Sequence, residues 1–187
     1  MRKLIVFNHV SLDGYFTAAN GDSSWAHNGS DDPEYAKWVA DNAGNNSQFL
    51  FGRKTYDLMA GYWPSPQAKQ QNPDVAEAMN QMPKVVFSKS LDKVLWNNTK
   101  LLKEGLVNET MKMKSESGPD ILIFGSGTII SQLAKENLID VYMMVLNPLV
   151  LGEGRTMFEG ISQMKNFVLK ETKVFKNGKI LLNFVPA

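Results

Sequence analysis

A glycine-rich segment that follows an apolar run could bind a phosphate in this chain. Ile121 to Phe124 are apolar without a polar break, and Gly125-Ser126-Gly127 comes directly after them. Such a run predicts a buried strand that ends at the glycines. Thr128 is placed to cap a following helix, so amide N–H groups at the join would approach an anion closely. A tight turn without a ligand would contain similar residues. The apolar face of that helix would consist of Ile129, Ile130, Leu133 and Ala134.

Two more polar turns follow predicted strands. Gln48 to Gly52 predicts a strand, and Arg53-Lys54-Thr55 then offers two cations and a hydroxyl at the start of a helix. Lys84 to Phe87 predicts another strand, followed by Ser88-Lys89-Ser90. Ligands of open α/β sheets bind at the carboxyl ends of the strands, so these turns could form one anion site with the glycine segment. Lys54 and Lys89 could equally be solvated surface lysines.

Candidate substrate contacts lie after the first predicted strand, Leu4 to Val10. Asp13 could hold a substrate hydroxyl or amine, although an aspartate before glycine also suits a plain turn. Trp25 lies in a long loop, Ser11 to Ser30, where its ring could stack on a flat substrate or pack on the core. His9, a lone histidine on a buried strand, is expected to be structural.

Composition limits the function classes. The chain has 187 residues, 43% of them hydrophobic, which suits one globular domain over residues 1–187. Lysine and arginine total 20 against 19 acidic residues, so no overall field favours nucleic acid or an acidic membrane. There is no cysteine and there are two histidines, so we expect a reducing, cytoplasmic compartment and no metal site. No apolar run approaches the roughly 20 residues of a membrane-spanning helix.

The elements that would position these residues alternate between strand and helix. Asp32 before Pro33 predicts the start of a helix that ends near Gly44. Three prolines make Gly61 to Pro73 a predicted loop, and Asp74 to Met82 a helix. The apolar face of the first helix would consist of Ala36, Val39, Ala40 and Ala43.

The second half of the chain continues this alternation and then changes. We expect a short strand at Lys100 to Leu102 and a helix at Gly105 to Lys114. The residues of that helix facing the sheet would be Leu106, Val107, Thr110 and Met111. Asp140 to Leu146 predicts a strand. A C-terminal antiparallel hairpin is expected where Phe167 to Phe175 and Lys179 to Val185 flank Asn177-Gly178.

The order of these motifs resembles the dihydrofolate reductase-like family across nearly the whole chain, and especially the reductase domain of bacterial riboflavin biosynthesis. Ser11 to Gly14 resembles the loop after the first strand, and Gly52 to Tyr56 resembles the Gly-Arg-x-Thr turn. Leu138 to Pro148 and Leu151 to Gly154 resemble the riboflavin-type ending. The resemblance implies a three-layer α/β fold with a mostly parallel central sheet, helices on both faces and an antiparallel C-terminal hairpin.

The resemblance also implies NADPH as the cofactor and hydride transfer to a small polar heterocycle or a related carbonyl or imine. Ser88 to Ser90 would hold the 2′-phosphate, and Gly125 to Ile129 the pyrophosphate. The expected cofactor contacts are Gly52, Arg53, Lys54, Thr55, Ser88, Lys89, Ser90, Gly125, Ser126, Gly127, Thr128 and Ile129.

On the substrate side the chain departs from the folate enzymes. Tyr35 occupies the first-helix position of their carboxylate, with Trp38 as the aromatic residue one turn later. A neutral phenol cannot pair with a protonated pterin, so we expect dihydrofolate to be a poor substrate. We expect Asp13 to be catalytic as well as to bind substrate. The remaining substrate contacts would be Trp25, Tyr35, Gly154 and Arg155.

The missing carboxylate also keeps a second class of function open. The chain could be a non-catalytic nucleotide-binding or regulatory protein that retains the fold. The riboflavin-type relatives usually form dimers, so a homodimer is expected, with Val141 to Val145 and the C-terminal hairpin as the pairing surface.

Overall fold

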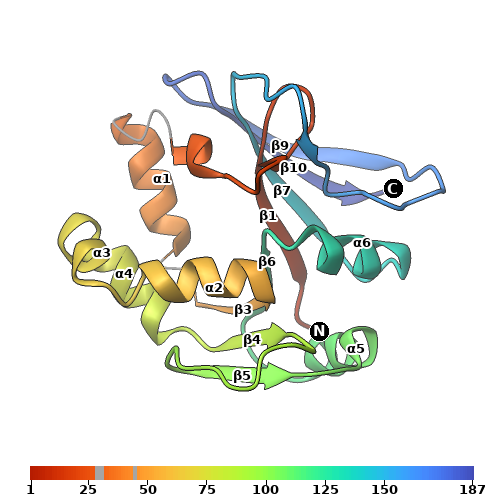
Figure 1. Ribbon diagram of the computed structural model, residues 1–187. Helices are drawn as coiled ribbons and strands as arrows, with labels where there is room; N and C mark the ends of the chain where they lie inside the picture. Colours follow the sequence, from red (N-terminus) through yellow and green to blue (C-terminus); the bar gives the residue numbers. More distant parts are fainter. Residues whose placement is uncertain (28–31, 44–45) are drawn as a thin grey trace.

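The computed structural model describes residues 1–27, 32–43 and 46–187. An eight-stranded sheet crosses the molecule in the order β5-β4-β3-β6-β1-β7-β10-β9 (Figure 1). Strands β2 and β8 form a separate two-stranded ribbon. The strands are β1 (Leu4–Val10), β2 (Thr17–Ala18), β3 (Ser47–Gly52), β4 (Lys84–Phe87), β5 (Thr99–Leu102), β6 (Asp120–Phe124), β7 (Val141–Leu146), β8 (Gly154–Arg155), β9 (Phe167–Val174) and β10 (Ile180–Pro186).

Helices cover both faces of the sheet. Helices α1 to α4 lie on one side, and α5 and α6 lie on the other (Figure 1). Within the described residues, none of the helices has the length and apolar character needed to cross a membrane. The helices are α1 (Pro33–Ala43), α2 (Arg53–Tyr62), α3 (Pro66–Gln71), α4 (Pro73–Gln81), α5 (Leu106–Ser115) and α6 (Gly127–Lys135), with a 3-10 turn, η1, at Ser24–His27.

Strand β6 lies between β3 and β1, although it follows both by many residues. Its Ile121 is in register with Gln48 of β3 and with Leu4 of β1, and both pairings are parallel. The six strands from β5 to β7 are parallel, whereas β10 is antiparallel to both β7 and β9. The predicted mixed α/β architecture, with a mostly parallel sheet and an antiparallel hairpin, is confirmed. The expected apolar run of β6 is covered on both faces.

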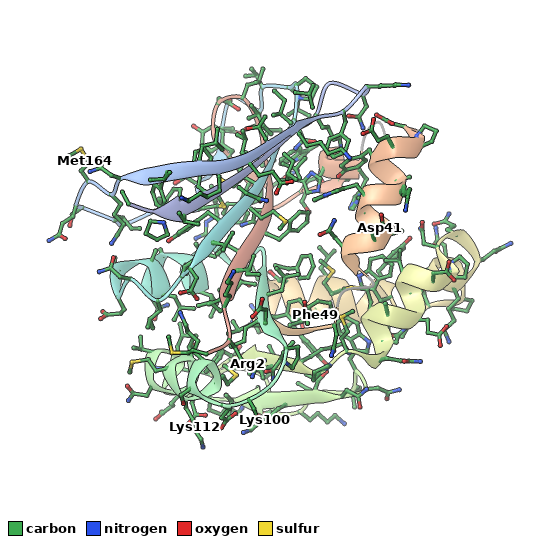
Figure 2. All side chains as sticks on the ribbon, turned by 180° about the vertical axis from the view of Figure 1, so that it is seen from behind. Arg2, Asp41, Phe49, Lys100, Lys112 and Met164 are labelled. Atoms are coloured by element: carbon green, nitrogen blue, oxygen red, sulfur yellow. The ribbon has the colours of Figure 1, made fainter. Side chains whose placement is uncertain are left out.

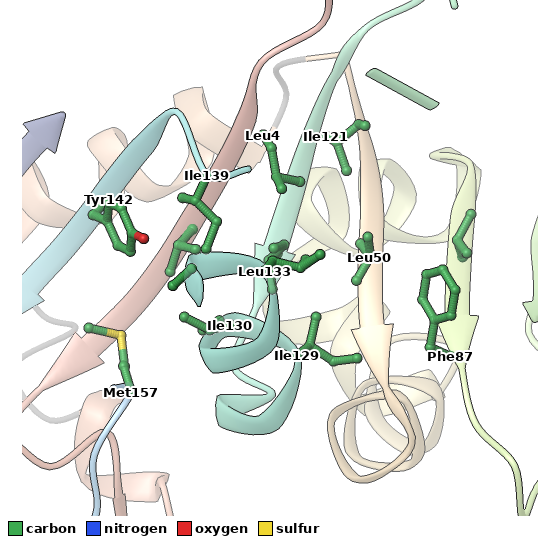
Figure 3. Close-up of a cluster of buried hydrophobic side chains, with 14 of the residues drawn as sticks. Leu4, Leu50, Phe87, Ile121, Ile129, Ile130, Leu133, Ile139, Tyr142 and Met157 are labelled. Carbon is green, nitrogen blue, oxygen red and sulfur yellow. The ribbon is translucent and has the colours of Figure 1, made fainter. Parts of the chain in front are cut away.

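The core beneath α5 and α6 is mostly aliphatic, with the rings of Phe87 and Tyr142 at its sides (Figure 3). Alternate residues of β1 and β6, such as Leu4 and Ile121, meet Ile130 and Leu133 of α6 there (Figure 3). These side chains are fully buried, and each removes most of its apolar area from water, worth about 1.5 to 3 kcal/mol. The apolar face predicted for α6 is therefore correct.

The opposite face of the sheet is aromatic. Phe49 of β3 points into the layer of α1 to α4 (Figure 2). Its ring lies 5.2 Å from that of Phe124, which in turn lies 5.6 Å from Phe7 of β1. Phe7 continues to Trp38 of α1, at 6.0 Å. This row of rings joins helix α1 to the middle of the sheet.

The buried face of α1 differs from the prediction. Ala36 and Ala40 are exposed, whereas Tyr35 is buried and Trp38 and Val39 are half-buried against the sheet. Large rings bury more apolar area than alanines, so they determine which way an amphipathic helix turns. The expected helix end at Gly44 lies outside the described residues.

Two further predictions about helices are corrected. The predicted loop from Gly61 to Pro73 contains helix α3, because Ser65 accepts a hydrogen bond from the Ala68 amide at 3.2 Å and Pro66 takes the first helical position. In α5, Met111 is exposed and Met113 is buried instead. The side of α5 that faces the core consists of Leu106, Thr110 and Met113, which are spaced four and three residues apart, about one helical turn each.

The amino ends of the parallel strands are closed by Arg2, which lies next to α5 (Figure 2). Its guanidinium donates to the carbonyl oxygens of Pro119 and Met113 and, at 2.6 Å, to Gln48 Oε1. These bonds tie β1, β3 and α5 together. The turns predicted to bind the cofactor lie at the other edge of the sheet.

Candidate functional site

Five parallel strands deliver polar turns to the carboxyl edge of the sheet. Asp13 follows β1, Gly52 closes β3, and Ser88 follows β4. Gly125 follows β6, and Asn147 follows β7. Because β6 lies between β3 and β1, the glycine turns after β3 and β6 are neighbours in space. These turns therefore lie at one edge of the sheet.

The two glycine turns are in direct contact through one serine. The Gly52 amide donates to Ser126 Oγ at 2.7 Å, and Thr55 Oγ1 lies 2.9 Å from the same oxygen. A β-carbon on Gly52 would stand 2.9 Å from Ser126 Oγ, and one on Gly125 would stand 2.9 Å from Thr55 Oγ1. Both glycines are therefore required by the close approach of the two turns.

Two helices begin at this contact and point their amino ends to the same place. Helix α2 starts at Arg53 and α6 at Gly127, and the first amides of each have no acceptor within their own helix. The partial positive charge of both helix ends favours an anion. Two neighbouring helix ends with small residues at the join form a suitable site for a diphosphate.

The capping residue of α6 is not the predicted one. Ser126 precedes the helix with a left-handed backbone, φ 58°, and its carbonyl accepts from the amides of Ile129 and Ile130. Thr128 is instead the second residue of the helix. The side chain of Ile129 is buried in the core, so the structure gives it a packing role; its contact with a cofactor stays a prediction.

Cationic side chains surround the amino end of α2. Arg53 and Lys54 are exposed, and Arg53 is 3.4 Å from Asp57 with both side chains 47% exposed. An exposed pair of this kind contributes little, so the guanidinium is free to turn towards an anionic ligand. In register, Gly52 is opposite Phe87, which brings the Ser88 turn beside Arg53.

The Ser88 turn presents its donors outward. Ser88 itself is buried, and its Oγ accepts from the amides of Ser90 at 3.3 Å and Leu91 at 3.0 Å. Lys89 and Ser90 are exposed. Ser88 therefore shapes the turn, while Lys89 and Ser90 are the side chains available to a ligand.

The loop after β1 lies over the amino end of α6. A β-carbon on Gly127 would stand 2.9 Å from two ring carbons of Phe16. The loop is fastened to the segment around β8, where Thr17 pairs with Arg155 and Ala18 with Gly154. Gly154 is required there, because a β-carbon would lie 2.3 Å from the Thr17 carbonyl oxygen. The aromatic ring of this loop thus faces the predicted phosphate site.

Asp13 holds this loop in place. Its carboxylate accepts from the amides of Gly152 at 2.8 Å and Leu151 at 3.2 Å. A hydrogen bond from Ser11, followed by these amides, lowers the pKa of Asp13. The structure gives Asp13 a positioning role, and the assignment of Asp13 as a catalytic residue stays a prediction.

We expect Asp13→Ala to loosen the segment around β8 without emptying the phosphate site. Amide hydrogen exchange at Leu151 and Gly152 should accelerate by about tenfold or more, because their acceptor is removed. Affinity for NADPH, the predicted cofactor, should change less than about threefold. Asp92→Ala, at an exposed carboxylate 3.9 Å from Lys103, is the control. Unchanged exchange in Asp13→Ala would show that the loop is held by other contacts.

The remaining predicted substrate contacts differ in how exposed they are. Trp25 is buried, and its Nε1 donates to the Asp22 carbonyl at 3.2 Å, so its ring packs inside the molecule. Arg155 is half-buried and pairs with Glu159 at 2.8 Å. Tyr35 is 4% exposed, and its hydroxyl lies 3.3 Å from His9 Nε2. Their contacts with a substrate stay predictions.

Two residues beside Tyr35 are not among the predicted functional residues. His9 was expected to be structural, but it is half-buried and lies in a polar chain between Tyr35 and Asn147. Lys179 was read only as the start of a strand, yet its Nζ lies 4.6 Å from the centre of the Tyr35 ring. A contact between residues 35 and 179 depends on how α1 packs against the hairpin, which no local pattern encodes.

The chain is similar to known proteins in sequence and in fold. The chain is 26% identical to the uncharacterized protein YyaP of Bacillus subtilis (strain 168), over 96% of this chain and 92% of that protein. A Shewanella sp. PV-4 protein attributed to riboflavin biosynthesis superposes with a TM-score of 0.74 at 21% identity, over 99% of both chains.

Dihydrofolate reductase from Enterococcus faecalis superposes with a TM-score of 0.65 at 15% identity, over 98% of this chain and 96% of that enzyme. These superpositions show that the chain has the dihydrofolate reductase-like fold. The model of the RibD C-terminal domain matches residues 2–181. The chain therefore belongs to the RibD C-terminal domain family.

Proposed function

We propose that this protein is an NADPH-dependent reductase that transfers a hydride to a small polar heterocycle or a related carbonyl or imine. The observation that carries the proposal is the contact of two helix-forming turns through Ser126, which joins two anion-favouring helix ends. The reductases of this fold class supply the chemistry by analogy. The bound nicotinamide would provide the hydride, and the protein would bind and orient it.

The residues present fit a dinucleotide phosphate. The amino ends of α2 and α6 would hold the diphosphate with backbone amides, at glycines 52, 125 and 127 where a β-carbon would intrude. Arg53, Lys54 and Lys89 would offset its charge with charge-assisted hydrogen bonds. Thr55, Ser90 and Thr128 would add hydroxyl donors.

The substrate would lie beside the aromatic row of the opposite face. Phe7, Trp38 and Phe124 are half-buried, so their rings are partly accessible to a flat ligand. The site would lie next to the carboxyl ends of β1 and β6, from which the cofactor turns also begin. We place the protein in the cytoplasm, where reduced dinucleotides are available.

NADPH should bind at least tenfold more tightly than NADH in titrations at one fixed ionic strength. Arg53→Ala and Lys89→Ala should each lower this ratio by about tenfold, because a charge-assisted hydrogen bond contributes about 1.5 to 3 kcal/mol. Lys112→Ala, an exposed lysine of α5 on the far side of the sheet, should leave the ratio unchanged. Equal affinities for the two cofactors in the wild-type protein would contradict the proposed 2′-phosphate contacts.

A second candidate function is supported by helix α1. Tyr35 replaces the carboxylate with which the folate enzymes bind their substrate, so a protein that binds the nucleotide without turnover is the alternative. Tight NADPH binding together with no oxidation of NADPH against a panel of pyrimidine, pterin and carbonyl acceptors would favour this alternative.

We also propose that the protein is a homodimer. Strand β7 is flanked by β1 and β10, so Val141 to Val145 offer a face and not an edge to the pairing surface predicted with the C-terminal hairpin. Within that hairpin, β9 lies at one end of the sheet, and its Leu169 is 48% and its Val174 64% exposed. Exposed apolar residues on a free strand edge favour pairing with another copy.

Light scattering at micromolar concentration should give twice the 20.9 kDa mass of the chain. Leu169→Asp should shift the mass towards the monomer, because it places a charge on the pairing strand. Leu95→Asp, at an exposed position outside the sheet, should leave it unchanged. A wild-type mass of a single chain would disprove the dimer.

A further inference from the structure

A group of hydrogen-bond donors lies where α1, β1 and the C-terminal hairpin meet. The Tyr35 hydroxyl is 3.3 Å from His9 Nε2. Lys179 is 2% exposed, and its Nζ is 2.6 Å from the Ala26 carbonyl oxygen and 4.6 Å from the centre of the Tyr35 ring. Three polar side chains from three elements therefore face one another beside the aromatic row.

Asn147 determines which nitrogen of His9 carries the proton. Its Nδ2 lies 2.9 Å from the Val145 carbonyl, 3.3 Å from the Val10 carbonyl and 3.3 Å from His9 Nδ1. Two carbonyl oxygens require a donor opposite them, so the amide nitrogen must face this way. His9 Nδ1 is then an acceptor, and the proton of the neutral ring is on Nε2, towards Tyr35.

The group formed by His9, Tyr35 and Lys179 carries either a net positive charge or no charge. Burial, and then the positive charge of Lys179, lowers the pKa of His9 to about 3, so its ring is neutral. Lys179 itself has no carboxylate within ion-pair distance among the described residues. A buried ammonium with one carbonyl acceptor has donors left over, because it carries three N–H groups.

The two described acidic residues at the start of α1, Asp32 and Glu34, do not change this balance. Asp32 accepts from the amides of Glu34 at 2.9 Å, Tyr35 at 3.3 Å and Asn177 at 3.0 Å, which is the predicted helix cap extended to the hairpin. Glu34 is paired with Lys173 at 3.1 Å. Both carboxylates are engaged, and neither is a partner for a ligand at Tyr35.

A flat ligand could reach this group along the aromatic row. The rings of Phe7 and Trp38 are half-buried, and the Phe7 ring lies 5.6 Å from that of His9 at an interplanar angle of 87°. His9 is half-buried, so it is the member of this group that is partly exposed at the end of the aromatic row. A ligand stacked on the row would present its own polar edge to His9, with Tyr35 and Lys179 behind.

We propose that His9, Tyr35 and Lys179 are specificity-determining residues that select a ligand with a carbonyl or carboxylate oxygen and reject one with a protonated amidine. The inference rests on the proposed substrate site. A donor group can satisfy an acceptor oxygen, whereas an amidinium would set N–H against N–H next to a buried positive charge. The folate enzymes carry a carboxylate at the position of Tyr35, so the charge preference of this site is reversed.

The test uses two flat probes of the same shape and opposite charge, benzoate and benzamidine. Both are titrated into the NADPH-saturated protein, because the cofactor then covers the phosphate site. Binding is read from the imidazole nitrogen signals of His9, which are resolvable because the chain has two histidines. Benzoate should bind at least tenfold more tightly than benzamidine, and it should shift the His9 Nε2 signal.

Three variants test which residues cause the preference for benzoate over benzamidine. Lys179→Met and Tyr35→Phe should each reduce the benzoate-to-benzamidine ratio by about fivefold or more, and Tyr35→Asp combined with Lys179→Met should invert it. Lys176→Met, an exposed lysine of the same hairpin, is the matched control and should leave the ratio unchanged. Circular dichroism and the cofactor titration identify any variant that fails to fold.

The inference is overturned by equal or stronger binding of benzamidine, by a ratio that Lys179→Met and Tyr35→Phe leave unchanged, or by probes that do not perturb His9. Its failure is distinct from that of the proposed function. If NADPH does not bind, the cofactor assignment fails, and the probe titration without cofactor still reports on His9. If NADPH binds and neither probe reaches His9, only the specificity site is disproved.

Discussion

Gly127→Val should weaken NADPH binding by about 100-fold or more while the protein remains folded. A β-carbon at this position stands 2.9 Å from two ring carbons of Phe16, and a branched side chain would also cover the first amides of α6. A 100-fold loss corresponds to about 2.7 kcal/mol. Isothermal titration with NADPH measures the affinity, and thermal unfolding measures the stability of the variant.

Two comparison variants separate the effect of the clash with Phe16 from the effect of covering the α6 amides. Gly61→Val is the matched control, because Gly61 also lies in a helix and its β-carbon would meet nothing within 4 Å. Phe16→Ala with Gly127→Val removes the clash with the ring and keeps the valine over the amides. If this double variant binds NADPH normally, displacement of Phe16 and not loss of the phosphate site explains the single variant. A folded Gly127→Val protein with unchanged affinity would show that the cofactor does not use this turn.

The free energy of unfolding should fall by about 2 to 3 kcal/mol between pH 6.5 and pH 4.5. Burial, with Lys179 as the second cause, lowers the pKa of His9 from 6.5 to about 3 in the folded protein. Below pH 6.5 the unfolded chain takes up a proton that the folded chain does not. Each pH unit in this window therefore reduces stability by up to about 1.4 kcal/mol. The stability contributed by the neutral ring is fully present above pH 6.5.

Urea unfolding at several pH values between 7.5 and 4.5 measures this slope. His9→Gln should flatten most of it, because glutamine has no proton to gain. His27 also has a lowered pKa, mainly by burial with Lys179 as the lesser cause, but it is exposed, so His27→Gln should have the smaller effect. Carboxylates contribute to the pH dependence of the unfolding free energy only near and below their ordinary pKa of about 4. A slope that His9→Gln leaves unchanged would assign the acid sensitivity to other groups.

Much of the fold could be predicted from local patterns. The uninterrupted apolar run of Ile121 to Phe124 predicts a strand covered on both faces, and Asn177-Gly178 predicts the hairpin, because each depends on nearby residues only. The face of α1 could not be predicted in this way. Alanines and aromatic residues both recur at helical spacing there, and the sheet that receives Tyr35 and Trp38 decides between them.

The residues of the candidate site also differ in whether local sequence could predict them. Gly52, Gly125 and Ser126 could be proposed from the sequence because glycine and serine at strand ends have a direct local meaning. That one serine hydroxyl joins both turns could not be, because residues 52 and 126 meet only through the insertion of β6 between β3 and β1. His9 and Lys179 were missed for the same reason, since nothing near either residue indicates the other.

The position of β1 in the sheet has a consequence for how the chain folds. Its first register partners, Ile121 on β6 and Val141 on β7, are both more than 110 residues away in sequence. The apolar segment Leu4–Val10 is thus the first part of the sheet to be synthesised and among the last to be paired. Contacts of such long sequence separation slow folding and leave apolar strands exposed meanwhile. A ribosome-bound chain that ends before β6 would carry an unpaired, aggregation-prone strand at its amino terminus, and the central sheet can form only after most of the chain has been made.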